Sequence, residues 1–289
     1  GRAGSRPITA ADISRLGLRP GVTPPVLLST DRGIVNPYSL QFSLGFDREI
    51  SGGTNVSVNY IGNRAVKVIR SRNTNLRQAG ASPYGPGYGP AFAPMDPRIL
   101  QTTQVESSGS SIYHGLAISA LKRYSNNYQF QFSYTWSKAI DDATDFITDL
   151  QPANQLDLQA ERGLSSWDQR HRLVFSGLVS WPSGLEGTAW GKVFSGTTLS
   201  PIVTYGSGRP FNLLLGFDAN KDTQANTDRP PGVGRNTGRR PDYFGVDLRL
   251  AKEIRPRGES DFRIEAIVEA FNLFNRVDFS GVNSILGSC

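Results

Sequence analysis

The sequence predicts an all-β protein, an antiparallel up-and-down sheet of about eight long strands that belongs to a transmembrane β-barrel. Three observations lead to this prediction. Apolar and polar residues alternate along several segments, most of these segments are longer than the usual strands of globular sheets, and the connections between them alternate between short and long. We therefore expect the long connections to lie together at one end of the sheet.

Strict alternation identifies the strands in chain order. At 38–47 the even positions are apolar and the odd positions are polar or glycine, and Gly52-Gly53 then connect this strand to a second one at 55–60. At 128–136 five aromatic side chains share one face and alternate with glutamine, serine and threonine. The same period of two predicts the remaining strands at 112–123, 172–181, 193–215, 243–252 and 262–274, the third of these with an interruption at Gly206-Ser207-Gly208.

Strand length and loop length both favour a membrane barrel. Most of the predicted strands have about nine to thirteen residues, and a tilted strand needs about nine to eleven to cross a bilayer. Long connections at 70–111, 137–169 and 216–242 alternate with short ones, which is the loop asymmetry of outer-membrane barrels. Residues 1–36 are expected to form an irregular or strand-connecting segment with a short helix at 9–16, and residues 37–289 the barrel wall.

The polar face of the last two predicted strands carries charged residues. Asp247 and Arg249 share one face of their strand, and Arg263, Glu265 and Glu269 share one face of the next. Across a barrel lumen these residues can pair with one another, whereas in a soluble β-sandwich the apolar face is the core and the charges are hydrated. We predict that the apolar face contacts lipid and that these five residues line the lumen.

Composition excludes several other classes. The formal net charge is +6, but the cations are mostly arginine and are spread along the chain, often close to acidic residues, so nucleic acid is not expected as a partner. One cysteine and two histidines provide neither a disulfide framework nor a Cys- or His-based metal site. No apolar run approaches the roughly 18 residues that a transmembrane helix needs.

The loop after the strand predicted at 193–215 has a side chain with a carboxylate or amide oxygen at every second position. Ca²⁺-binding loops begin with oxygen ligands at this spacing. Thr223 replaces the usual turn glycine, and Arg229 stands where a bidentate glutamate closes such a site. We therefore predict no obligatory cofactor, and favour a solvated acidic turn over a weak Ca²⁺ site. The candidate metal ligands are Asp218, Asn220, Asp222 and Asp228.

Two further loops are candidates for ligand contact. A Gly/Pro-rich segment carries Tyr84, Tyr88 and Phe92, whose rings either face a ligand or belong to a long, poorly ordered loop. Asp141 and Asp142 begin a second acidic loop. External ligand contact or helix capping is favoured there over paired-carboxylate catalysis, because nothing in the sequence supplies a cleft where two carboxyl groups converge.

Several short motifs resemble those of a known family in both order and spacing. They are NPY at 36–38, VNYIGNR at 58–64, YHGL at 113–116, FSYTWSKAIDD at 132–142, AERGLSSWDQRHR at 160–172, YGSGRPF at 205–211 and EAFNLFN at 269–275. On these motifs the sequence resembles the barrel of TonB-dependent receptors of the Oar-like type, in which a carboxypeptidase-regulatory-like domain and a plug precede the barrel. The resemblance covers nearly all of residues 36–280.

The resemblance implies a location, partners and a mechanism. Family barrels have about 22 strands, so a chain with eight is expected to be the C-terminal portion of a receptor in the outer membrane of a diderm bacterium. By this analogy external loops capture an unknown solute, and energy arriving through TonB displaces a plug held by the lumen wall. The implied partners are the TonB system, the plug domain, outer-membrane lipid and this solute.

Two other functions remain open from the sequence. The alternative is a secreted all-β adhesion or carbohydrate-binding module, with or without stabilising Ca²⁺, which would be soluble without detergent because its apolar face is a core. A β-rich hydrolase is less favoured, because Asp168 and His171 lack the G-x-S-x-G motif that holds a nucleophilic serine. We therefore predict that the protein is not an enzyme.

Overall fold

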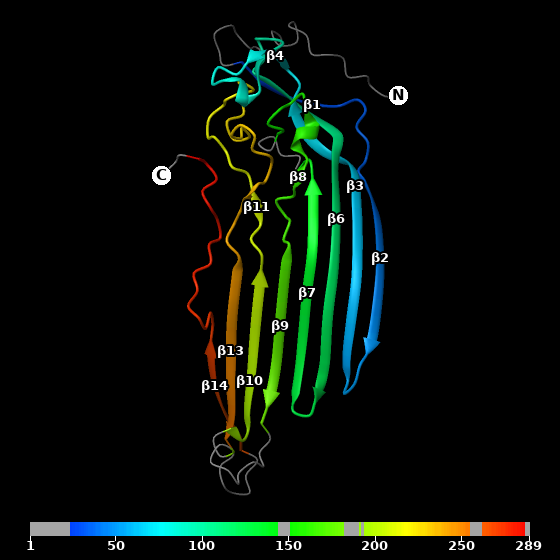
Figure 1. Cartoon of the computed structure of the whole chain (residues 1–289), viewed down its shortest axis with the longest axis vertical. Coiled ribbons are helices and arrows are strands. Elements are labelled where there is room, and N and C mark those ends of the chain that lie inside the picture. Colours follow the sequence, from blue (N-terminus) through cyan, green and yellow to red (C-terminus); the bar gives the residue numbers. More distant parts are fainter. Residues whose placement is uncertain (1–23, 144–150, 182–190, 192–193, 255–261, 287–289) are drawn as a thin grey trace.

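The structure, a computed structural model, describes residues 24–143, 151–181, 191, 194–254 and 262–286 (Figure 1). The short helix predicted at 9–16 lies outside these residues. Long strands run side by side along the molecule, and the long connections gather at one end (Figure 1). Within the described residues, no helix is long and apolar enough to cross a membrane.

Eight antiparallel strands form the main path of the sheet, and their spatial order is their order in the chain. The sheet is therefore an up-and-down meander, and the predicted fold class is confirmed. The strands are β2 (Tyr38–Glu49), β3 (Thr54–Asn73), β6 (Gln101–Ser125), β7 (Tyr128–Asp141), β9 (His171–Ser180), β10 (Thr197–Gly206), β13 (Tyr243–Ile254) and β14 (Ile264–Ala270).

Smaller elements lie with the long connections at one end of the sheet, which we call the loop end (Figure 1). β1 pairs in parallel with the start of β6, β8 pairs with the end of β7, and β4–β5 and β11–β12 are separate two-stranded sheets. β1 falls in the segment expected to be irregular or to connect strands. The bounds are β1 (Val26–Thr30), β4 (Leu76–Ala81), η1 (Pro86–Tyr88), β5 (Pro90–Pro94), η2 (Leu158–Glu161), β8 (Gly163–Leu164), β11 (Pro210–Phe211) and β12 (Gly238–Arg239).

The pairing register aligns apolar side chains across the wall formed by the eight strands. One row of cross-strand partners consists of Val58, Ile118, Tyr134, Leu173, Tyr205 and Phe244. On the opposite face, Ser57, Ser119 and Ser133 form a corresponding polar row. Because successive side chains point to opposite faces, a slip of one residue would exchange the two rows, so the alternation fixes the register.

Among the described residues, no second layer covers the apolar face of the wall. Leu44, on this face midway along the edge strand β2, is 76% exposed. Of the six buried apolar residues in the described chain, only Ala251 belongs to the wall, and the others lie at the loop end. A β-sandwich would bury this face against a second sheet. Lipid is the environment that matches it, so the structure argues against the soluble alternative.

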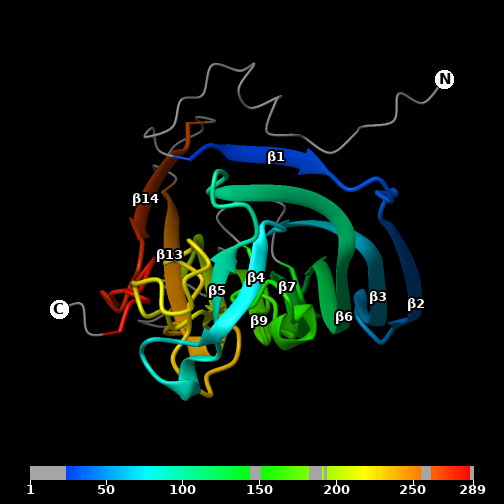
Figure 2. The ribbon, with the colours of Figure 1, turned by 90° about the horizontal axis from the view of Figure 1, so that it is seen from above.

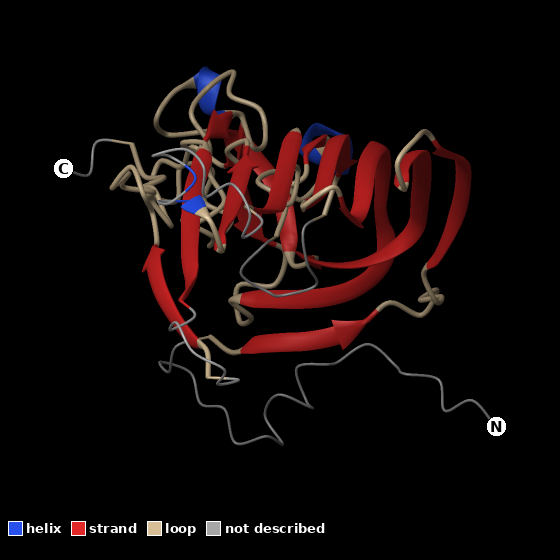
Figure 3. Ribbon diagram, turned by 90° about the horizontal axis from the view of Figure 1, so that it is seen from below, coloured by secondary structure: helices blue, strands red, loops and turns tan. Residues whose placement is uncertain are grey.

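The wall is curved and does not close. Figures 2 and 3 show it along the strands as an incomplete ring. Among the described residues, its edge strands β2 and β14 each pair on one side only. Trp167 and Arg209 from the loops fold over the polar face and enclose a cavity with Tyr113 and Ser137 of the wall. The polar face is therefore the interior of a partial barrel, as predicted.

Tight turns join β2 to β3 and β6 to β7 at the end opposite the long loops. Gly52 and Gly53 connect β2 to β3 with φ values of 63° and 73°, and Asn126 and Asn127 connect β6 to β7 with φ values of 51° and 67°. Two consecutive left-handed residues match the right-handed twist of a hairpin, and glycine and asparagine adopt this conformation at the lowest cost.

β3 and β6 are longer than the sequence indicated, with 20 and 25 residues. The prediction that 70–111 is a long loop was wrong at both ends, because the two strands stay paired as far as Asn73 and Thr103. A register irregularity lies beside Lys67, whose φ is 60°. The extensions rise beyond the wall and carry polar residues on both faces, so the alternation of hydropathy does not reveal them.

Candidate ligand-binding region at the loop end

Four arginine–carboxylate pairs hold the loop end together. They are Arg70–Asp142 (2.7 Å), Arg72–Glu106 (2.8 Å), Arg229–Glu161 (2.6 Å) and Arg235–Asp141. Apart from the side chain of Arg72, the charged side chains of these pairs are nearly buried. Removing a charge from water costs several kcal/mol, and pairing with good geometry offsets this cost. The pairs therefore fix the relative positions of segments that are far apart in the sequence.

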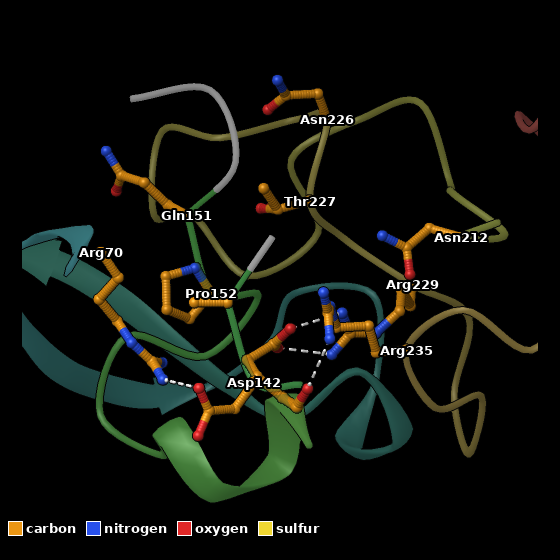
Figure 4. A pocket seen from close by; sticks show the side chains of 11 residues that line it. Arg70, Asp142, Gln151, Pro152, Asn212, Asn226, Thr227, Arg229 and Arg235 are labelled. Carbon is orange, nitrogen blue, oxygen red and sulfur yellow. Dashed lines mark hydrogen bonds and ion pairs between the residues drawn. The ribbon is translucent and has the colours of Figure 1, made fainter. Parts of the chain in front are cut away.

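The two aspartates predicted to contact a ligand belong to this network. Asp142 accepts hydrogen bonds from the Arg70 guanidinium and from the backbone N–H and hydroxyl of Ser110, each at 2.7 Å. Asp141 accepts from the Arg235 guanidinium, which also donates to two backbone carbonyls. Figure 4 shows the Arg70–Asp142 pair at the end of β7. Both carboxylates anchor the start of a loop, and direct contact with a ligand stays a prediction.

A small polar cavity of about 40 Å³ lies inside the network (Figure 4). Arg70, Arg229 and Arg235 line it together with Asp142 and Glu161, so positive and negative groups are nearly balanced. Nε and Nη1 of Arg70 have no protein partner among the described residues. A polar cavity of this size suits a few ordered waters, and it is too small for a solute.

The acidic loop uses its side-chain oxygens to bind its own backbone. Asp218 accepts from the amides of Asp222 and Thr223, both at 3.1 Å, and Asp222 accepts from the amide of Gln224 at 2.8 Å. Such contacts hold tight turns, including the left-handed Thr223 with φ 78°. In the part of the chain that the structure describes, no three His, Cys, Asp or Glu residues are grouped to hold a metal ion. The prediction of a solvated turn was wrong for Asp222 and Asp228, which are 0% and 4% exposed. The less favoured alternative, a Ca²⁺ site, stays a prediction.

Burial changes the titration of two carboxylates in this loop. Loss of hydration raises the pKa of Asp222 to about 7 and the pKa of Asp228 to about 6. The backbone amides of Gln224 and Ala219 donate hydrogen bonds to Asp222 and Asp228, respectively, and these bonds lower the pKa of each carboxyl group. The negative charge of the nearby Asp218 carboxylate raises both pKa values further. The loop is therefore held together with less negative charge than its sequence suggests.

Two loops that the sequence treated separately are in contact. The ring of Tyr84 lies 4.9 Å from that of Phe217, and Nζ of Lys221 lies 5.2 Å from the centre of the same Tyr84 ring. The Ser82 hydroxyl donates to the carbonyl of Ala219 at 2.6 Å. The Gly/Pro-rich loop is thus packed against the acidic loop, which argues against a poorly ordered segment.

A second cavity, of about 270 Å³, opens between these loops. Tyr88 and Phe92 line it on one side, and Asn220 and Asp228 on the other. Tyr84 is 50% exposed, whereas Phe92 is only 3% exposed. Among the predicted aromatic residues, Tyr84 and Tyr88 are accessible to a solute, while Phe92 is part of the small apolar core of the loop end.

A third cavity, of about 420 Å³, lies at the mouth of the lumen. Tyr113, Ser137 and Arg172 contribute from the wall, and Trp167 and Arg209 from the loops. The Arg209 guanidinium lies 5.4 Å from the centre of the Trp167 ring, within the range of a cation–π contact. Aromatic and cationic groups therefore face the entrance to the interior.

Two of the five charged residues predicted to line the lumen form an ion pair. Arg249 and Glu269 are cross-strand partners on β13 and β14, and their charged groups lie 3.5 Å apart. Asp247, on the same face as Arg249, accepts a hydrogen bond from the backbone of Asn272 at 2.8 Å. Asp247 thus binds the segment that follows β14.

The other two predicted lumen residues lie near the opposite end of this strand pair. Glu265 is the cross-strand partner of Glu253, so two like charges face each other. Arg263 lies 3.9 Å from the Glu253 carboxylate. A contact of these residues with a plug domain stays a prediction.

Among the described residues, no hydrolytic triad is assembled around His171. Its Nδ1 lies 2.8 Å from the hydroxyl of Tyr134. Asp168 accepts from the backbone N–H of Ala139 at 2.7 Å and from Arg170 at 3.3 Å. Both groups are therefore engaged in structural contacts.

Sequence reasoning missed two residues at the centre of the loop end. Arg70 belongs to the polar extension of β3, where arginines alternate on either side of Ser71, and this pattern is a signal that a polar strand continues. Gln155 is fully buried, accepts from the amide of Asn73 at 3.0 Å and donates to the carbonyl of Pro152 at 2.9 Å. A single glutamine in a loop carries no such signal.

A curved wall with a lipid-facing side, a polar interior, tight turns at one end and long packed loops at the other defines part of a transmembrane β-barrel. A family model described as an outer membrane beta barrel domain matches residues 5–233. The chain belongs to this outer-membrane β-barrel family, and its place is the outer membrane.

Several solved structures are similar to this chain at low sequence identity. The outer membrane transporter YddB from Escherichia coli aligns with a TM-score of 0.50 and 12% identity, over 88% of this chain and 31% of that one. FpvA of P. aeruginosa bound to pyoverdine aligns with a TM-score of 0.48 and 12% identity, over 85% and 24%. The FrpB iron transporter from Neisseria meningitidis aligns with a TM-score of 0.47 and 12% identity, over 86% and 29%.

The chain therefore spans less than a third of the length of each of these proteins. At this identity the YddB alignment supports the fold and does not extend to a ligand. A search of curated proteins found no match.

Proposed function

We propose that this chain is part of the barrel of a TonB-dependent outer-membrane receptor that captures a large or scarce solute and takes it up with energy supplied through TonB. The main support is the unclosed wall with a polar concave face. A closed eight-stranded barrel fills its interior with its own side chains, whereas barrels of about 22 strands hold a separate plug. Among the described residues, the eight strands do not close into a ring of their own.

Capture of the solute is assigned to the loop end. The cavity beside Tyr88 has a volume of about 270 Å³, and the cavity beside Trp167 and Arg209 one of about 420 Å³. The first lies among the external loops and the second at the mouth of the lumen, so a solute would meet them in that order. The outer membrane transporter YddB shares this fold, which agrees with a transport role.

The wall would hold the plug through polar and charged contacts. Arg249 and Glu269 are paired but about half exposed, so both retain hydrogen-bonding capacity toward the interior. The same holds for the polar row through Ser133. No covalent chemistry is needed in this role, because displacement of the plug is driven from the inner membrane.

Chemical labelling of the lumen tests the proposal. In the intact protein, with the native Cys289 replaced by serine, Ser133→Cys places a thiol on the polar face and Tyr84→Cys places one on an exposed loop. A membrane-impermeant maleimide is added to whole cells. We expect the lumen thiol to react much more slowly than the loop thiol, and to react faster in energised cells than in cells treated with a protonophore.

A matched control uses the neighbouring residue of the same strand. Phe132→Cys points to lipid and should stay unreactive under both conditions. If the thiol at Ser133→Cys reacted as fast as the loop thiol and were insensitive to the protonophore, the barrel would be a passive pore and the proposal would fail.

A further inference from the structure

Four nitrogen-bearing side chains form a row on the lipid-facing side of the wall. Arg64 on β3, His114 on β6, Lys138 on β7 and His171 on β9 come from four neighbouring strands. His114 and Lys138 are direct cross-strand partners, and Arg64 and His171 are their diagonal neighbours on the same face. Direct and diagonal neighbours lie within about 8 Å of each other, so the row is continuous.

Both histidines of the chain are held by a tyrosine in the same way. The hydroxyl of Tyr60 lies 2.8 Å from Nδ1 of His114, and the hydroxyl of Tyr134 lies 2.8 Å from Nδ1 of His171. In each pair the ring planes differ by 17°. Each tyrosine is the diagonal neighbour of its histidine, so the orientation of the imidazole on the sheet is repeated. Among the described residues, Nε2 of both rings has no partner and remains available.

The row lies at the level expected for lipid headgroups. Immediately toward the turn end, the same face carries Tyr60, Tyr134 and Trp136, and amphipathic aromatic rings of this kind mark the edge of the hydrocarbon region. From Tyr128 to Trp136 the strand advances by roughly 26 Å, which a tilt of about 40° reduces to roughly 20 Å across the membrane. This is comparable to the apolar band of outer-membrane barrels, about 25 Å.

The two strong cations of the row lack an acidic partner within the described chain. Arg64 and Lys138 are exposed, and neither forms an ion pair or side-chain hydrogen bond with another described residue. Four arginines of the loop end, by contrast, pair with carboxylates: Arg70, Arg72, Arg229 and Arg235. Unpaired cations beside an apolar band attract an anion that comes from the membrane itself, and a phosphate group accepts hydrogen bonds from guanidinium, ammonium and imidazole alike.

We propose that Arg64, His114, Lys138 and His171 bind the phosphate groups of anionic lipids in the leaflet next to the loop end. The tyrosines hold the two imidazoles in position between the cations. This inference goes beyond the proposed transport function, because the site faces away from the lumen.

Competition between two lipids tests the site. The intact protein is stripped of lipid in a neutral detergent, and phosphatidylglycerol and phosphatidylcholine with identical acyl chains are added. Bound lipids are counted by native mass spectrometry. Each cation near a lipid phosphate contributes about a fivefold gain in affinity, so Arg64→Gln with Lys138→Gln should lower the affinity for phosphatidylglycerol about thirtyfold.

Two comparison variants make the result specific. Arg48→Gln with Arg123→Gln removes two exposed cations at the turn end and should leave binding nearly unchanged. Arg64→Lys with Lys138→Arg keeps both charges and should retain the preference. Unchanged binding in the first double variant, an equal loss in the turn-end variant, or displacement of the lipid by millimolar inorganic phosphate would each overturn the proposal.

Discussion

The wall and the loop end of this protein bury different kinds of residue. The wall exposes an apolar face, as Leu44 shows, and buries almost none of its large apolar side chains. The loop end does the reverse, because its buried side chains are mainly polar or charged, including Arg70, Asp141 and Glu161. The difference follows from the surroundings of each region. Lipid covers the wall, whereas the loops are in water and enclose polar groups only by pairing them.

The two regions should therefore respond to substitution in different ways. A wall residue meets lipid on one face and the polar interior on the other, so the cost of a charge depends on which of two neighbouring positions receives it. A loop-end residue belongs to a pair, so the cost depends on whether its partner is left behind. The four predictions below are ordered by expected size.

The largest effect is expected for the buried pair of Arg235 and Asp141. Arg235→Ala leaves the Asp141 carboxylate buried without its cation, which should destabilise the loop end by about 3–5 kcal/mol. Arg235→Met combined with Asp141→Leu removes both charges and should recover most of the loss. Limited proteolysis of the loops in the intact, lipid-reconstituted protein measures the effect. A single variant as resistant as the unmodified protein would show that water reaches this pair.

The next effect compares two adjacent residues of β7. Phe132→Arg places a charge on the lipid-facing side near the middle of the wall, which should cost about 2–4 kcal/mol of folding stability. Ser133→Arg places the same charge on the polar face and should cost far less. Urea unfolding of both variants in lipid vesicles gives the difference directly. Equal costs would contradict the assignment of the faces.

The acidic loop should respond to pH. Burial raises the pKa of Asp222 to about 7, above its ordinary value of 3.8, so the folded loop binds more protons than the unfolded chain between these values. The stability of the loop should therefore fall as the pH rises from about 4 to 7.

Thermal unfolding of the loop end at pH 5 and pH 8 tests this dependence. Asp222→Asn removes one of the two perturbed carboxylates and should reduce the difference between the two pH values, and Asp222→Asn with Asp228→Asn should reduce it further. Greater stability of the unmodified protein at pH 8 than at pH 5 would show that the sign is wrong.

The sequence predicted the wall well because lipid imposes a period of two. The aromatic side chains of 128–136 and the glycines at 52 and 53 located strands and a turn without reference to the rest of the chain. The extensions of β3 and β6 were missed, because a strand that leaves the membrane no longer has one apolar face. The pair of Arg235 and Asp141 joins residues 94 positions apart, and no local pattern predicts such a contact.

The smallest effect is expected for Arg249 and Glu269 on the lumen face. Their side chains are 48% and 45% exposed and the charged groups lie 3.5 Å apart, so water screens the pair and its coupling energy should be below about 1 kcal/mol. A double-mutant cycle with Arg249→Gln and Glu269→Gln, read from urea unfolding in vesicles, isolates this term. The coupling energy between Arg249 and Glu269 should decrease further in 1 M salt, whereas the loss of stability caused by Arg235→Ala should not. A coupling above about 2 kcal/mol would mean that this part of the interior is dry, and would place the two charges under a tightly packed plug and not beside water.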